Sequence, residues 1–270
     1  MRTSATFIGT ATVLLRLGGF TVLTDPNFLH RGQRAHLGYG LSSRRRTDPA
    51  MEPGQLPALD GIVLSHLHGD HFDRIARRRL PRDVPVITTR PAARTLRKWR
   101  FDATVGLRDW EDVVLHRGGE TLRITAVPAQ HGPAGLHLAM PLTIGTILDW
   151  RHDEGERLRL YITGDTLFRA RRLRDIPRHF GDIDAMLLHL GGTRILGALV
   201  TMDARQGLAM SRLIRPGVIV PIHYDDYTVF RDPLSNFLRA AAATELAGTV
   251  KPVVRGETVS LLPEPARIAG

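Results

Sequence analysis

The sequence of 270 residues contains no cysteine. This absence excludes disulfide bonds and thiolate metal sites, so any metal ligands must be histidine, aspartate or glutamate, which suit zinc, iron or manganese. No apolar run approaches the roughly 20 residues of a membrane span. The N-terminal residues also lack the charged segment and long apolar stretch of a signal peptide. We therefore expect a soluble cytoplasmic protein.

Lysine is nearly absent, although the formal net charge is +10 and the sequence pI is about 11.0. Lys98 and Lys251 are the only lysines, so almost all of the positive charge is arginine. A basic chain can bind nucleic acid, phosphate or a membrane surface. The tightest arginine runs, residues 44–46 and 77–79, have no interleaved aromatic residues that could stack on bases. We therefore expect a small-molecule substrate and no nucleic-acid partner.

The chain also lacks low-complexity linkers and repeats, and its length suits one well-packed domain over residues 1–270. Short apolar runs bounded by turn residues predict strands at 12–17, 20–24, 61–64, 84–88, 121–127, 158–162, 185–188 and 218–221. Helical spacing of apolar residues predicts helices at 71–79, 92–99, 173–180, 203–213 and 233–246. Gly18-Gly19 predicts a hairpin turn. This order of elements indicates sheets covered by helices, an α/β layered architecture.

One segment places four metal-binding side chains directly after an apolar strand. In an extended chain, side chains two residues apart face the same side, so His66 and His68 should point together. Gly69 permits a sharp turn, and Asp70 and His71 are then expected at the start of the following helix, turned back toward the same point. Burying four such groups uncompensated is costly, and a divalent cation removes that cost. The pattern H-x-H-x-D-H therefore predicts a metal site.

Three later residues share this context, because His131, Asp165 and His223 each follow a separate apolar run. Each is a weak signal by itself, since a lone aspartate after a strand is commonly a cap or turn residue. Together with the first motif they bring the number of candidate ligands to seven, enough for two metal ions.

The order of these motifs resembles the metallo-β-lactamase-fold superfamily. H-x-H-x-D-H is followed by His131, by Asp165 in Thr-Gly-Asp-Thr and by His223 in Pro-Ile-His-Tyr, and the resemblance runs from residue 8 to about residue 230. The segments Ile-Gly-Thr-Ala-Thr at 8–12 and Leu-Thr-Asp-Pro at 23–26 resemble one branch, which contains ascorbate-6-phosphate lactonase-like and N-acylphosphatidylethanolamine phospholipase D-like proteins.

The resemblance implies an αββα sandwich with a dinuclear metal site at one edge between the two sheets. It implies that one metal is held by His66, His68 and His131, that the other is held by Asp70, His71 and His223, and that Asp165 bridges them. Two divalent ions are expected, Zn²⁺ in the first place, with Mn²⁺ and Fe²⁺ as alternatives.

The positions around this metal site differ from the branch. Thr201 stands where a histidine is common, Tyr224 and Asp225 stand where Trp-Gly is common after the last ligand, and His189 lies in Leu-His-Leu-Gly where Leu-Pro-Ile-Gly is common. The resemblance therefore does not transfer a phospholipase or a particular lactonase activity. Substrate choice is expected to depend on three irregular loops, at 26–57, 132–142 and 191–202.

Four residues are candidates for contact with the substrate or for support of the ligands. His189 follows an apolar strand, so it either faces the metals or is a core histidine bonded to the backbone. Tyr224 and Asp225 are candidates because they adjoin a ligand. Asp25, which precedes a proline, either hydrogen-bonds a ligand histidine or caps a turn.

The function expected from these residues is metal-dependent hydrolysis. Two metals that share a water lower its pKa from about 15.7 toward 7, and Asp70 would orient the bridging hydroxide for attack on a small ester, lactone, amide or phosphate ester. The alternative is phosphodiesterase-, phospholipase- or nuclease-like activity on a phosphate-containing substrate, which the basic charge leaves open. A di-iron redox protein is disfavoured, because such relatives usually carry glutamate in place of His68. A non-catalytic metal-binding protein is also disfavoured, because no ligand is missing.

Overall fold

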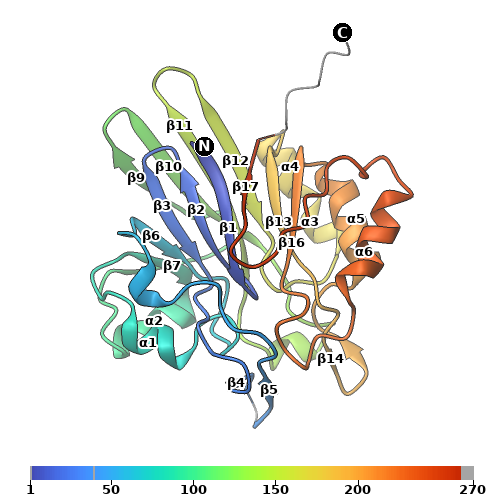
Figure 1. Cartoon of the computed structure of the whole chain (residues 1–270). Helices are drawn as coiled ribbons and strands as arrows, with labels where there is room; N and C mark the ends of the chain where they lie inside the picture. The colour runs from blue at the N-terminus through green and yellow to red at the C-terminus, as the bar shows by residue number, and fades with distance from the viewer. Residues whose placement is uncertain (1, 39, 263–270) are drawn as a thin grey trace.

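Two β-sheets face each other and form the centre of the molecule (Figure 1). The computed structural model describes residues 2–38 and 40–262. In spatial order, the first sheet contains β17 (Thr258–Ser260), β1 (Thr3–Gly9), β2 (Thr12–Leu17), β3 (Phe20–Thr24), β6 (Gly61–Val63), β7 (Val86–Thr89) and β8 (Thr104–Leu107). The second contains β16 (Val218–Ile222), β13 (Ala185–His189), β12 (Arg157–Ile162), β11 (Ile144–His152), β10 (Glu120–Pro128) and β9 (Asp112–Arg117).

Each sheet is antiparallel in one part and parallel in the other. Strands β17, β1, β2 and β3 pair antiparallel, whereas β3, β6, β7 and β8 pair parallel. In the second sheet β9 to β12 pair antiparallel, and β12, β13 and β16 pair parallel. Strands β6, β7, β13 and β16 are buried along their whole length, as expected for strands that pair parallel and are covered on both faces.

Helices cover the outer face of each sheet. Figure 1 shows α1 (Arg74–Arg79) and α2 (Arg90–Lys98) beside β6 and β7. The helices α3 (Ala170–Leu173), α4 (Asp175–Phe180), α5 (Ala204–Ile214) and α6 (Leu234–Ala242) lie beside the second sheet. Two short 3₁₀ helices, η1 (Pro53–Gln55) and η2 (Leu136–Leu138), lie in connections. This arrangement confirms the αββα sandwich.

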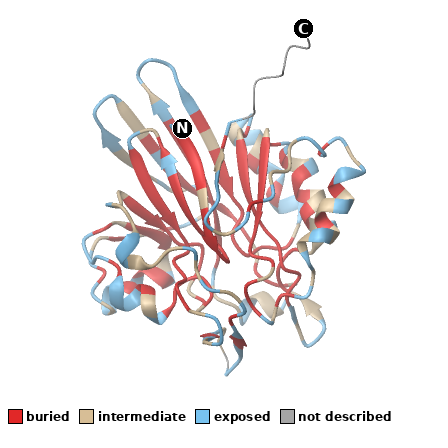
Figure 2. Ribbon diagram, in the orientation of Figure 1, coloured by how far each residue is buried: buried red, intermediate tan, exposed pale blue. Residues whose placement is uncertain are grey.

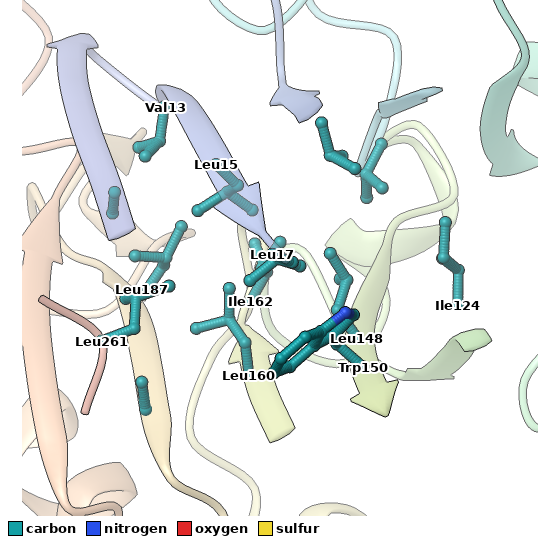
Figure 3. Close-up of a cluster of buried hydrophobic side chains, with 14 of the residues drawn as sticks. Val13, Leu15, Leu17, Ile124, Leu148, Trp150, Leu160, Ile162, Leu187 and Leu261 are labelled. Atoms are coloured by element: carbon teal, nitrogen blue, oxygen red, sulfur yellow. The ribbon is translucent and has the colours of Figure 1, made fainter. Parts of the chain in front are cut away.

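Apolar side chains fill the space between the two sheets. Figure 3 shows Val13, Leu15 and Leu17, which alternate along β2 and face Leu160 and Ile162 of the second sheet. The strands are correspondingly buried over most of their length in Figure 2. Full burial of each such side chain contributes roughly 1.5–3 kcal/mol. The largest apolar cluster of the described residues is therefore made jointly by both sheets.

The predicted elements correspond closely to the observed ones, with informative differences. The Gly18-Gly19 turn is confirmed, because Leu17 pairs with Phe20 across it. The prediction that Asp70 and His71 begin a helix is wrong. They lie in a loop, and α1 starts only at Arg74 because the Asp73 side chain caps it.

The loops predicted to be irregular contain short hairpins. Segment 26–57 carries β4 (Arg34–His36) and β5 (Ser42–Arg44), and segment 191–202 carries β14 (Arg194–Ile195) and β15 (Ala198–Leu199). Among the described helices, none combines the length and the apolar character that crossing a membrane requires.

Candidate metal centre

Four chain segments meet at one edge of the sandwich, each directly following a strand. They follow β6, β10, β12 and β16, and they carry all seven candidate ligands. The seven are buried in the protein: His66, His68, Asp70, His71, His131, Asp165 and His223. The shared fold edge explains why residues so far apart in sequence converge here, because the carboxyl ends of parallel strands lie side by side.

Three histidines form the first group. Nε2 of His66 lies 2.9 Å from Nδ1 of His68, and the ring of His131 lies 5.1 Å from that of His66 and 5.2 Å from that of His68. One ligand atom from each of the three can be chosen so that all lie within 4.8 Å of one another. This spacing allows one cation to contact all three.

A second group contains Asp70, His71 and His223. Nε2 of His71 lies 3.1 Å from Nε2 of His223, which in turn lies 3.6 Å from Oδ2 of Asp70. The ligand atoms of these three residues also lie within 4.8 Å of one another. The two groups therefore have the same composition as the two ligand sets that the resemblance implied.

Asp165 lies between the groups. Its Oδ2 is 3.3 Å from Nε2 of His71, 3.8 Å from Nε2 of His131 and 4.0 Å from Nε2 of His66. Its Oδ1 is 3.5 Å from Nδ1 of His223. One carboxylate thus approaches histidines of both groups.

The donor atoms fit a divalent cation. In a tetrahedral site with metal–nitrogen bonds of 2.0–2.1 Å, neighbouring ligand atoms lie about 3.3 Å apart, close to the 2.9 and 3.1 Å between the facing histidine nitrogens. Oδ1 of Asp70 and Oδ1 of Asp165 are buried without a hydrogen-bond partner. Buried carboxylate oxygens are rarely left unpaired, so these two atoms point to a cation as their partner.

Burial and electrostatics separate the histidines into two protonation classes. Burial lowers the pKa values of His66, His68 and His131, and the repulsion of neighbouring histidines lowers them further, to about 4 for His68. Burial also acts on His71 and His223, but the carboxylates around them raise the pKa of both above the usual value. The first group therefore favours neutral imidazoles, the form that binds a cation, whereas the second group favours protonation more strongly.

Asp25 supports the ligand loop from behind. Its Oδ1 accepts hydrogen bonds from the backbone N–H and the hydroxyl of Ser65, at 2.8 and 3.0 Å. Its Oδ2 lies 3.3 Å from Nδ1 of His71. Burial would raise the pKa of Asp25, but the charge of His71 and hydrogen bonds of His71 and His189 lower it to about 2. A carboxylate on the far nitrogen of a ligand histidine fixes its orientation.

His189 lies behind His71, away from the cavity at the centre. The two rings stack with 6.0 Å between centroids and 9° between planes. Nδ1 of His189 lies 3.2 Å from the Thr163 hydroxyl, and Nε2 lies 3.5 Å from Oδ2 of Asp25. The ring thus contacts side chains that surround the centre, and one of its nitrogens lies within 4.8 Å of ligand atoms of Asp25 and His71.

Tyr224 and Asp225 lie outside the cluster, contrary to their selection as candidates. The Tyr224 hydroxyl donates to the carbonyl of Val253 at 3.2 Å. Asp225 is partly exposed and pairs with Arg255. Both side chains point away because His223 adopts a positive φ of 62°, which turns the chain after the last strand.

The sequence interpretation missed a buried network that starts at the next residue, Asp226. Its Oδ2 accepts from the backbone N–H of Thr10 at 2.7 Å, and the Thr10 carbonyl accepts from the His223 backbone N–H at 2.7 Å. Oδ1 of Asp226 lies 3.2 Å from Nη2 of Arg45, and the side chains of Asp226 and Arg45 are both fully buried.

The same network reaches the first ligand loop. Arg45 also donates to the Asn27 side chain, whose Nδ2 donates to the carbonyl of Gly69 at 2.8 Å. No local pattern marks these residues as partners, because the contacts of the network join segments up to 216 residues apart. The network therefore ties the His223 loop and the His66–His71 loop to one another.

A small cavity opens beside the candidate ligands. The space open to the centres of water-sized molecules is about 20 Å³, roughly the room that one water needs. His68, Asp70, His131 and Asp165 form one side. The remaining wall comes from the three segments expected to govern substrate choice, together with Val229: Leu37, Met140, Thr193, Ile195, Val200 and Thr201.

Comparison with known proteins finds relatives among metal-dependent hydrolases. A family model described as a beta-lactamase superfamily domain matches residues 21–224. N-acyl-phosphatidylethanolamine-hydrolyzing phospholipase D 1 of Caenorhabditis elegans is 28% identical, with 83% of this chain and 64% of that protein covered. A UPF0173 metal-dependent hydrolase of Cupriavidus taiwanensis is 29% identical, with 90% and 81% covered. The chain spans 64% of the length of the first curated relatives that it matches.

Solved structures show the same fold. The crystal structure of isothiocyanate hydrolase from Delia radicum gut bacteria superposes with a TM-score of 0.77 at 22% identity, covering 96% of this chain and 99% of that one. A possible metal-dependent hydrolase from Veillonella parvula superposes with a TM-score of 0.80 at 20% identity, covering 96% and 100%.

Proposed function

Because the chain belongs to the beta-lactamase superfamily, we propose that it is a dinuclear metal-dependent hydrolase of small molecules. The position of Asp165 carries this proposal, since its carboxylate approaches histidines of both groups. A single-metal site would not need a second group of ligands around the same carboxylate. Relatives named as metal-dependent hydrolases add support.

The seven candidate residues would hold the two ions as the resemblance implied. His66, His68 and His131 would bind one, Asp70, His71 and His223 the other, and Asp165 both. We expect Zn²⁺, with Mn²⁺ and Fe²⁺ as alternatives, because nitrogen and oxygen ligands accept all three. Divalent cations held there supply Lewis-acid chemistry, since they lower the pKa of a bound water from about 15.7 toward 7 and polarise a substrate oxygen.

The side chains around this centre have separate tasks. Asp70 lines the cavity and its Oδ1 has no hydrogen-bond partner, so this carboxylate could accept a hydrogen bond from an attacking water and orient it. Asp25 and Ser65 hold the imidazoles of His66 and His71 in place. Leu37 and Met140 line the opposite wall and exclude bulk water from the reacting atoms.

The apolar side chains of Leu37, Met140 and Val200 beside the candidate ligands support a small ester, lactone, amide or phosphate ester as substrate. A phosphodiester or phospholipid substrate is the second candidate. It is supported by the net charge of +10 and by the likeness to a relative named as a phospholipase D.

Metal content and turnover test the proposal together. We expect purified protein to contain about two metal ions per chain, measured by mass spectrometry of the metals. It should hydrolyse at least one of a lactone, a β-lactam and bis-(p-nitrophenyl) phosphate. Asp70→Ala should abolish turnover, whereas Asp182→Asn, at an exposed aspartate far from the centre, should not change it.

Three results would contradict parts of this proposal. Less than one metal ion per chain would contradict the metal centre itself. Full metal content with unchanged turnover in Asp70→Ala would remove the role of Asp70. A redox-active iron centre without hydrolysis would replace the hydrolase with an oxidoreductase.

A further inference from the structure

A second and larger cavity lies between β4, the start of α1 and the end of α2. Its volume is about 300 Å³, at the lower end of the range for small-molecule sites. Arg34 and His36 of β4 line one side, Arg74 and Arg77 of α1 the other, and Trp99 closes one end. The wall also includes His68, but none of the other candidate metal ligands.

The arginines of this cavity carry uncompensated charge. Within the described residues, Arg34, Arg74 and Arg77 form no ion pair with a carboxylate. Nη1 of Arg74 donates to the carbonyl of Arg34 at 3.3 Å, and Nη1 of Arg34 donates to the Ser42 hydroxyl at 3.3 Å. Three arginines thus line one cavity without an ion-paired carboxylate among the described residues.

The acidic residue in the wall does not neutralise them. Asp73 is buried, and its oxygens accept hydrogen bonds from the backbone N–H groups of Phe28, Ile75 and Ala76. Its carboxylate is therefore used to cap α1. Positive charge in the cavity remains available to a ligand.

The apolar end of the cavity is held rigidly. The Arg77 guanidinium lies 4.2 Å from the centre of the Trp99 ring, and Phe72 stacks on the same indole with 6.3 Å between centroids. Nη1 of Arg82 donates to the Trp99 carbonyl at 3.0 Å, which fixes the backbone. Leu29 and Leu67 complete this apolar wall.

We propose that this cavity binds a small organic anion, with its oxyanion group on Arg34, Arg74 and Arg77 and its apolar body against Trp99. Guanidinium groups bind carboxylate, sulfonate and phosphate oxygens through paired charge-assisted hydrogen bonds. The anion is either a separate ligand or the distal end of a substrate whose other end reaches the metal centre, since His68 borders both cavities.

The proposal does not depend on hydrolysis, because binding is measured directly. Benzenesulfonate is a suitable probe, since it carries an oxyanion and an aromatic ring, coordinates metals weakly and is not hydrolysed. Methanesulfonate offers the charge without the ring. Isothermal titration of the metal-loaded protein gives the affinity and stoichiometry of both.

We expect one benzenesulfonate per chain and much weaker binding of methanesulfonate. Arg74→Ala and Arg77→Ala should each weaken benzenesulfonate binding about tenfold, the effect of losing a charge-assisted hydrogen bond. Arg78→Ala is the matched control, because Arg78 lies on the same helix and is exposed outside the cavity. Circular dichroism should show that all three variants are folded.

Several results would overturn the proposal: no saturable binding, equal binding of methanesulfonate, or an equal loss of affinity in Arg78→Ala. Inhibition of the hydrolysis of bis-(p-nitrophenyl) phosphate distinguishes the two sources of the anion, a separate ligand or the distal end of a substrate. Competitive inhibition by benzenesulfonate, removed by Arg74→Ala, identifies the cavity as part of the substrate site. Binding without inhibition identifies a separate ligand.

Discussion

The histidines of the candidate metal centre differ in the protons that they hold before metal binding. Burial alone would lower the pKa of His71, but the carboxylates of Asp165, Asp25 and Asp70 raise it well above its usual value, so this imidazole favours its protonated form. The pKa of His68 is about 4 for the opposite reason, because burial and neighbouring histidines disfavour its charge. A cation must therefore displace protons from the group of Asp70, His71 and His223, but not from the group of the three other histidines.

Metal uptake should therefore release protons mainly from the second group. We expect two Zn²⁺ ions to bind in separable steps, one with little proton release and one with the release of about one or two protons, from His71 and His223. Because these protons leave as the pH rises, affinity in the second step should increase with pH, while affinity in the first step should change much less. Isothermal titration in buffers of different ionisation enthalpy measures the protons released. Equal proton release in both metal-binding steps would contradict the division of the histidines into two protonation classes.

Asp165 should be the residue whose loss affects both ions. We expect Asp165→Asn to reduce the metal content from about two ions to one or fewer, and turnover by at least about 100-fold, more than the loss of a residue that only supports a ligand. Metal analysis after exhaustive dialysis, with kinetics at saturating zinc, measures both. Asp182→Asn is the matched control, since it makes the same chemical change at an exposed aspartate that is not a candidate ligand. Retention of two tightly bound ions in Asp165→Asn would show that it does not bridge.

The sequence predicted candidate ligands better than their surroundings. Each of the seven follows an apolar strand, a signal that can be seen locally, and the structure brings all seven together. Nothing local distinguishes Asp226 from Asp225, although one is fully buried and the other pairs with Arg255 near the surface. The difference arises from the turn at His223 and from partners in distant segments, which no spacing rule encodes.

At the scale of elements, the connections that carry the ligands depend on the network around Asp226. It joins the turn after β1, the segment after β5 and the loop after β16 through Thr10, Arg45 and Thr47. Arg255, which precedes β17, adds a further hydrogen bond at 3.0 Å. These connections are otherwise irregular, so their positions are set by buried polar contacts.

Loss of one partner from this network should destabilise the protein strongly. We expect Asp226→Asn to lower the free energy of unfolding by about 3 kcal/mol, because it leaves the buried Arg45 without its counter-ion. The adjacent change Asp225→Asn should cost at most about 1 kcal/mol, because that ion pair lies near the surface. Urea denaturation of both variants measures the difference. Equal losses of unfolding free energy in the two variants would show that the buried ion pair of Asp226 and Arg45 adds little to stability.

Element boundaries show where prediction from the sequence ends. Strands β2, β3 and β12 were predicted to within a residue because their apolar runs are bounded by turn residues. The start of α1 was predicted three residues too early, since Asp73 is the cap and the metal-binding residues before it stay in a loop. Strands β4 and β5 were not predicted, because they are short, polar and exposed at alternate positions.

At the scale of the whole molecule, the two sheets depend on each other for their core. Leu15 and Leu17 of the first sheet share a single cluster with Leu148, Trp150 and Leu160 of the second (Figure 3). Separating the sheets would expose this entire interface to water, and each apolar side chain would lose roughly 1.5–3 kcal/mol. Neither half of the sandwich retains a comparable inner face of its own.

The prediction of one domain over residues 1–270 can therefore be tested by cooperativity. We expect metal-free protein to unfold in urea in one transition, with coincident curves from far-ultraviolet circular dichroism and tryptophan fluorescence. Leu160→Ala, at a fully buried position of the second sheet, should move both curves together to lower urea concentration. The free energy of unfolding should fall by about 2–5 kcal/mol. The exposed change Leu138→Ala should leave them in place. Two separate transitions, of which Leu160→Ala moved only one, would show that the halves fold independently.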